Sequence, residues 1–167
     1  TDTYGGPLAN RMRFPLEVAR RVRSAVPANL PVFVRISAAD WADGEWDVDS
    51  SIEFCRKLKD LGIDLIDVSS GGNSPDAKIT IGPGYQVPFA REIRSRAGIM
   101  TGAVGMITKP RQAAEILETG DADAILIARE SLRNPYFPFL AAAELGESIE
   151  VPKQYGRAIS IQKAKTV

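Results

Sequence analysis

Two stretches of the chain combine small residues with the end of an apolar run. They are 101–107 (Thr-Gly-Ala-Val-Gly-Met-Ile) and 125–132 (Ile-Leu-Ile-Ala-Arg-Glu-Ser-Leu). Where a strand gives way to a helix, backbone N–H groups lack partners, and the positive end of the helix favours an anion. Small residues let a phosphate approach the backbone, and Arg129 adds a fixed cation. Together the stretches predict a phosphate cradle, although each alone is also typical of a tight turn.

A further candidate is Arg35, the one charged residue inside the apolar run 31–37 (Pro-Val-Phe-Val-Arg-Ile-Ser). Its guanidinium could belong to a structural ion pair. It could equally face a ligand on which negative charge develops during a reaction, because a fixed cation stabilises such charge. The sequence favours the second interpretation, since no other charge lies in this run.

Composition limits the class of protein. A chain of 167 residues, 44% hydrophobic and 25% charged, predicts one globular domain with its own core. Its 21 basic and 21 acidic residues cancel, which gives no reason to expect a nucleic-acid partner. No apolar run approaches the roughly 20 residues that span a bilayer, so no membrane partner is predicted.

Two side chains common in active sites are scarce or missing. The sequence contains no histidine, which excludes imidazole catalysis and histidine metal sites within this chain. Its single cysteine, Cys55, cannot form an intramolecular disulfide or a CxxC site, and its spacing from Ile52 and Leu58 predicts a core position. We therefore predict no metal site and no catalytic residue within the chain. A reducing, cytoplasmic environment fits this composition.

Helices and strands alternate along the chain. Apolar periodicity and stop signals predict helices and strands in turn. The predicted helices are 10–25, 49–61 with Asp49 as N-cap, 89–97, 110–118 and 136–145, with a short turn at 131–134; the predicted strands are 31–37, 63–69, 99–103 and 124–128. The strand at 31–37 is nearly continuous in apolar character, which is typical of a strand covered on both faces.

This alternation requires parallel strands joined by right-handed crossovers. An open doubly wound sheet and half of a (β/α)8 barrel both satisfy it. A phosphate site on the last two strands, followed by a short helix, is typical of barrels. We therefore predict an α/β fold, the C-terminal half of a (β/α)8 TIM barrel with strands five to eight, over residues 1–146. Residues 147–167 are predicted to be a polar C-terminal tail that needs an external surface.

Several ordered motifs resemble the Old Yellow Enzyme flavoproteins, in particular their thermophilic-like bacterial ene-reductase branch. The motifs are 1–6 with Asn10-Arg11, 34–37, 83–87, 101–107, 128–130 with 132–135, and Tyr155-x-Arg157. The resemblance implies a (β/α)8 barrel that holds FMN at the C-terminal mouth of its strands. It also implies reduction of the flavin by NADPH or NADH and hydride transfer to an activated alkene, such as an enone.

The resemblance assigns roles to individual residues. It places Arg35 near N1 and O2 of the flavin ring, and it makes Val104, Gly105, Ala128 and Arg129 the phosphate contacts. Most relatives have glycine where Ala128 stands, and its methyl could crowd the phosphate.

Two more residues are assigned to the substrate side. Tyr85, beside Gln86, is expected to line it, although a loop tyrosine is as often only packing. Arg157 resembles an arginine that reaches into the active site of the neighbouring subunit, although a tail arginine is often simply solvated.

The family motifs that grip the substrate carbonyl with histidine are missing, so the chain resembles only the C-terminal half of an ene-reductase. We expect the isolated chain to be inactive and to associate with the missing N-terminal half-barrel or with another copy, as a homo-oligomer. A non-catalytic half-barrel that binds phosphate or flavin weakly, and an open-sheet nucleotide-binding protein, remain alternative functions.

Overall fold

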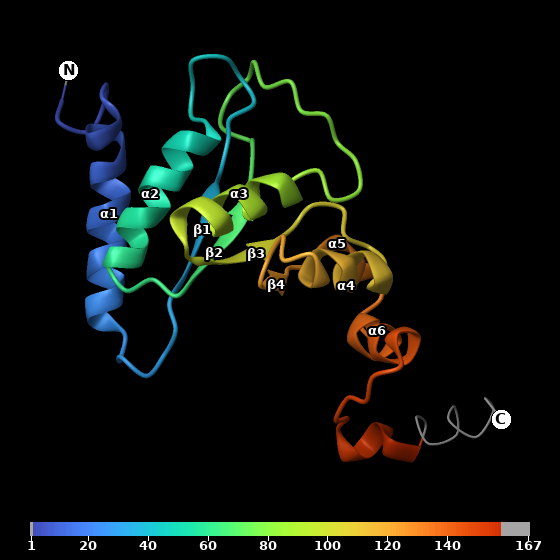
Figure 1. Ribbon diagram of the computed structural model, residues 1–167. Coiled ribbons are helices and arrows are strands. Elements are labelled where there is room, and N and C mark those ends of the chain that lie inside the picture. Colours follow the sequence, from blue (N-terminus) through green and yellow to red (C-terminus); the bar gives the residue numbers. More distant parts are fainter. Residues whose placement is uncertain (1, 158–167) are drawn as a thin grey trace.

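The computed structural model describes residues 2–157 and is organised around a parallel four-stranded sheet (Figure 1). The strands lie in chain order: β1 (Phe33–Ser37), β2 (Leu65–Ser69), β3 (Met100–Ala103) and β4 (Ala124–Ile125). This order has no point of reversal, whereas a doubly wound sheet reverses its strand order at the ligand site. The observed topology therefore argues against the open-sheet alternative.

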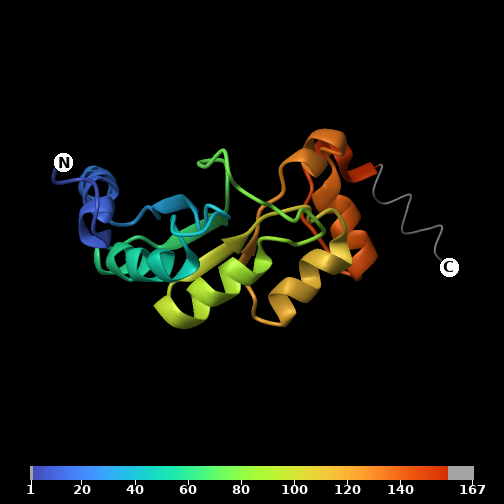
Figure 2. The same ribbon diagram turned by 90° about the horizontal axis from the view of Figure 1, so that it is seen from above.

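The strands alternate with helices that pack on one side of the sheet. Figure 2 shows α2, α3 and α4 along the same side of the strands. The described helices are α1 (Leu8–Ala25), α2 (Val48–Asp60), α3 (Val87–Ala97), α4 (Pro110–Glu118), α5 (Arg129–Arg133), α6 (Phe137–Leu145) and the 3-10 turn η1 (Lys153–Tyr155). The predicted α/β alternation is confirmed, and α4 has the predicted bounds. Residues 158–167 of the predicted tail lie outside the described residues.

The last strand is shorter than predicted. β4 contains two residues, whereas the apolar pattern predicted a strand over 124–128. Its ladder ends where Leu126 N donates to Ala103 O at 2.9 Å, because β3 itself stops at Ala103. The chain then turns into α5, which begins at Arg129 rather than at the predicted position 131. The end of β4 is thus set by its neighbouring strand and not by its own sequence.

The two faces of the sheet differ in burial. On the face covered by helices, Ile66 and Val68 of β2 are fully buried and pack in one core with Leu58 and Ile93. On the other face, Phe33 of β1 is 60% exposed. The prediction that the strand at 31–37 is covered on both faces is therefore wrong for this chain.

Cys55 belongs to the buried core. It is fully inaccessible on α2, and burial raises the pKa of its thiol to about 12. The predicted core position is confirmed, and the thiol is held in its neutral, unreactive form.

The N-cap of α2 is Asp47 and not the predicted Asp49. The Asp47 carboxylate accepts a hydrogen bond from Ser50 N at 2.8 Å, and the backbone of Asp47 is extended, as an N-cap requires. Asp49 lies in the first turn, where it pairs with Arg96 at 2.7 Å. The hydrogen bond from Ser50 lowers the pKa of Asp47.

We expect Asp47→Ala to reduce the free energy of unfolding at pH 7 by about 1 kcal/mol, because an orphan amide loses its acceptor. Since the native-state pKa of Asp47 is lowered, this contribution is complete above the ordinary value of 3.8 and disappears as the pH falls through the native pKa. Urea unfolding at several pH values measures it. Asp43→Ala, an exposed change in the same loop, serves as the control. Equal stabilities of the wild type and Asp47→Ala at pH 7 would contradict the assignment.

Candidate functional site

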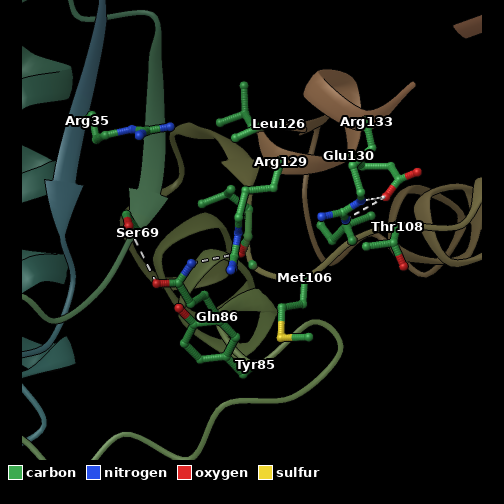
Figure 3. Close-up of a pocket in the computed structure, with 14 residues that line it drawn as sticks. Arg35, Ser69, Tyr85, Gln86, Met106, Thr108, Leu126, Arg129, Glu130 and Arg133 are labelled. Atoms are coloured by element: carbon green, nitrogen blue, oxygen red, sulfur yellow. Dashed lines mark hydrogen bonds and ion pairs between the residues drawn. The ribbon is translucent and has the colours of Figure 1, made fainter. Parts of the chain in front are cut away.

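A pocket of about 290 Å³ lies at the carboxyl ends of the strands, where α/β proteins bind ligands (Figure 3). It contains six of the seven predicted site residues, which come from the middle of β1, from the segments that follow β3 and β4, and from the loop before α3: Arg35, Tyr85, Val104, Gly105, Ala128 and Arg129. The fold thus places together residues that are up to 94 positions apart, from 35 to 129.

The segment after β3 presents unpaired amides. Its successive carbonyls are each anchored: Val104 O accepts from Gln86 Nε2 at 3.1 Å, Gly105 O from Gly84 N at 2.8 Å, and Met106 O from Gln112 Nε2 at 3.3 Å. Among the described residues, none accepts a hydrogen bond from the amides of residues 105–107. Successive backbone N–H groups that have no acceptor within the protein can form a concavity suited to an anion.

Gly105 is required at its position. Its φ of 126° lies in the left-handed region, and an added Cβ would lie 3.0 Å from Gln86 Nε2 and 3.2 Å from Tyr85 Cε1. Ala128, in contrast, has φ −108°, which any residue adopts. The backbone at position 128 therefore does not need a glycine.

The three arginines of the pocket differ in their pairing. Arg133 is matched by Glu130, with Nη2 to Oε2 at 2.6 Å. Arg129 is exposed, and none of the residues 2–157 lies within ion-pair distance of its guanidinium. Arg129 therefore offers an unmatched positive charge to the same pocket that the segment after β3 lines.

Arg35 makes a structural ion pair, which was one of its two possible roles from the sequence, and it also lines the pocket. Its Nε donates to Asp67 Oδ2 at 2.6 Å, and the register of β1 and β2 places the two residues side by side. The other carboxylate oxygen, Asp67 Oδ1, is buried without a partner among the described residues. Figure 3 shows the Arg35 side chain extending toward the pocket, so the ion pair holds Nε and leaves the outer nitrogens for a ligand.

The two residues predicted for the substrate side have different positions. Tyr85 lines the pocket, and its ring also packs near Trp41, with 6.4 Å between centroids. Arg157 is exposed beyond η1 and does not line the pocket. The structure therefore places Tyr85 with the cradle residues and Arg157 apart from them.

Several lining residues were not among the predicted ones. Gln86 was considered beside Tyr85, and the structure buries it, with 3% exposed, between the ends of β2 and β3. The Glu130 and Arg133 pair has a visible signal, because opposite charges three apart meet on a helix. The left-handed backbone of Met106, with φ 50°, has no such signal. The other unpredicted lining residues are Ser69, Ile107, Thr108 and Leu126.

Within residues 2–157 no cluster of acidic or cysteine side chains could hold a metal ion. None of the described helices is long and apolar enough to cross a membrane.

Comparisons with known proteins identify the family of this chain. Residues 1–147 match the NADH:flavin oxidoreductase / NADH oxidase family. An NADPH dehydrogenase of Geobacillus thermodenitrificans is 50% identical over 156 residues, which are 93% of this chain and 45% of that protein. An NADPH dehydrogenase of Halalkalibacterium halodurans is 51% identical over 158 residues, which are 95% and 46% of the two chains. The chain thus spans about half the length of the curated relatives it matches.

A solved structure, histamine dehydrogenase from Rhizobium sp. 4-9, superposes with a TM-score of 0.69 at 30% identity. The superposed region covers 87% of this chain and 21% of the histamine dehydrogenase chain. Rhamnonate dehydratase from Gibberella zeae, at 15% identity and a TM-score of 0.53, shares the fold alone. Because the family match covers most of its length, the chain belongs to the NADH:flavin oxidoreductase / NADH oxidase family.

Proposed function

We propose that this chain supplies the phosphate and N1/O2 side of the FMN site in an oxidoreductase that uses NADPH. The observation that carries the proposal is the pocket itself, where unpaired amides and an unmatched Arg129 lie together and Arg35 enters from β1. The names of the relatives, NADPH dehydrogenases, support the choice of reductant over NADH.

The residues present fit such a cofactor. The amides of residues 105–107 and Arg129 would hold the dianionic phosphate, since charge-assisted hydrogen bonds to phosphate are strong. The outer nitrogens of Arg35 would face the N1/O2 edge of the ring and stabilise negative charge there. Bound FMN would accept hydride from the nicotinamide and pass it to a substrate.

For the complete enzyme we propose reduction of the activated C=C bond of an α,β-unsaturated carbonyl compound. Tyr85, at the pocket wall, would contact the substrate, and Arg157 would do so in a neighbouring subunit. The described pocket contains no histidine to grip the substrate carbonyl. We therefore expect no enone reduction by the 167-residue chain alone.

We further propose that the sheet is half of an eight-stranded barrel. Its consecutive parallel strands, one-sided helices and open apolar face support this arrangement. The N-terminal half-barrel or a second copy of this chain would cover the open face. A non-catalytic half-barrel that binds flavin weakly is the second candidate function, and the same open face supports it.

The proposal predicts that the chain binds FMN at least about tenfold more tightly than riboflavin, because only FMN carries the phosphate. Quenching of flavin fluorescence during titration measures both dissociation constants. Equal affinities for the two flavins would remove the basis for a phosphate cradle at this pocket.

The open face predicts self-association at micromolar concentration, because exposed apolar strand residues are removed from water in the complex. Light scattering should give a mass above the 18.1 kDa of one chain. Phe33→Glu, on the open face of β1, should reduce association. Leu132→Glu, on α5 and 82% exposed, is the matched control and should not. A concentration-independent monomer would contradict the half-barrel arrangement.

A further inference from the structure

The hydrogen bonds around Gln86 connect the ends of three strands. Gln86 Oε1 accepts from Ser70 Oγ at 2.7 Å, just past β2, and Ser70 Oγ accepts from Trp41 Nε1 at 2.9 Å, in the loop after β1. On its other side, Gln86 Nε2 donates to Val104 O at 3.1 Å, just past β3. Because Gln86 is only 3% exposed, water does not readily replace these partners.

The bond to Val104 fixes the direction of one peptide plane. In a trans peptide the C=O of one residue and the N–H of the next point to opposite sides, and the described chain has no cis peptide. When Gln86 holds the Val104 carbonyl, the Gly105 amide must therefore point away from Gln86. No described residue accepts a hydrogen bond from that amide.

This backbone conformation is not one the chain adopts without support. Gly105 and Met106 are consecutive residues with positive φ, 126° and 50°, and a non-glycine residue in the left-handed region is uncommon. Conformations of this kind persist when surrounding contacts determine them. Gln86 provides such a contact from the start of α3, and the close fit of Gly105 against its side chain limits any alternative position.

We infer that Gln86 is a positioning residue for the phosphate cradle, which it serves by holding the Val104–Gly105 peptide so that the Gly105 amide faces the ligand. Gln86 itself need not touch the phosphate. The inference rests on the proposed function, since it requires a phosphate at these amides. It extends that function by assigning the orientation of the cradle to a side chain 19 positions earlier in the sequence.

The test compares FMN with riboflavin, because riboflavin lacks the phosphate and is insensitive to the cradle. Gln86→Met keeps the length and apolar packing of the side chain and removes its amide. We expect the preference of the 167-residue chain for FMN over riboflavin to fall about tenfold, with riboflavin affinity unchanged. Ser70→Ala leaves the bond to Val104 in place and should reduce the preference less.

A control separates positioning from stability. Ser51 on α2 is fully buried, accepts from Trp46 Nε1 at 2.6 Å and donates to Ala38 O at 2.8 Å, but does not line the pocket. Ser51→Ala should lower the melting temperature, as Gln86→Met should, yet leave the flavin preference intact. The amide NMR signal of Gly105 gives a direct measurement: inorganic phosphate should shift it in the unsubstituted chain and not in Gln86→Met.

The outcomes distinguish the two proposals. If the unsubstituted chain shows no preference for FMN, or Arg129→Ala leaves that preference unchanged, the proposed cradle fails and this inference fails with it. If Arg129→Ala abolishes the preference while Gln86→Met retains it, the inference alone is overturned. It is also overturned if the Gly105 signal does not respond to phosphate in the unsubstituted chain, or if Ser51→Ala reduces the preference equally.

Discussion

Arg129→Ala should weaken FMN binding by ten- to a hundredfold and leave riboflavin binding unchanged. Arg129 carries the unmatched guanidinium of the pocket, so its charge is available to a ligand, whereas the charge of Arg133 is neutralised by Glu130. A charge-assisted hydrogen bond to phosphate contributes about 1.5 to 3 kcal/mol, which corresponds to the stated range of affinities. Parallel titrations with the two flavins measure the effect.

The control for overall charge is Arg21→Ala. Arg21 is exposed on α1, makes no ion pair with any described residue and does not line the pocket, so its removal changes the net charge by the same amount. If Arg21→Ala weakens FMN binding as much as Arg129→Ala does, the effect of Arg129 comes from long-range electrostatics and not from a contact with the phosphate. If Arg129→Ala weakens both flavins equally, the residue supports the pocket wall and does not bind phosphate.

The sequence predicted a helix correctly where residues at its ends act directly on the local backbone. Pro110 at the start and Gly120 beyond the end gave α4 its correct bounds, because each acts on its own stretch of backbone. The cap of α2 was misplaced by two residues, since both Asp47 and Asp49 are suitable caps by type. Only the backbone conformation distinguishes them.

The pocket could be predicted only in part, for the same physical reason. Gly105 and Arg129 could be singled out by residue type alone, because glycine tolerates positive φ and arginine is a fixed cation. The role of Gln86 depends on the ends of β2 and β3, which meet around it, and no local pattern encodes that meeting. The open face of β1 could not be read from its apolar run either, because a run of this kind does not reveal whether its cover lies within the same chain.

The ion pair of Arg35 and Asp67 leads to a prediction about the reduction potential of bound FMN. Asp67 holds Nε of Arg35 at 2.6 Å, so the carboxylate fixes the direction of the guanidinium and offsets part of its charge. Negative charge arrives on the flavin only when the ring is reduced. Arg35 should therefore stabilise the reduced cofactor more than the oxidised one.

We expect Arg35→Ala to lower the two-electron reduction potential of bound FMN by about 30 to 60 mV, which is the equivalent of a charge-assisted hydrogen bond of 1.5 to 3 kcal/mol. The unpaired Asp67 carboxylate left behind acts in the same direction. Asp67→Asn should raise the potential, because it removes a negative charge and leaves the guanidinium in place. Oxidised FMN should bind nearly normally to both variants, and redox titration against reference dyes measures the potentials. Potentials unchanged in both variants, or shifted in the same direction, would show that Arg35 does not face the N1/O2 edge of the flavin.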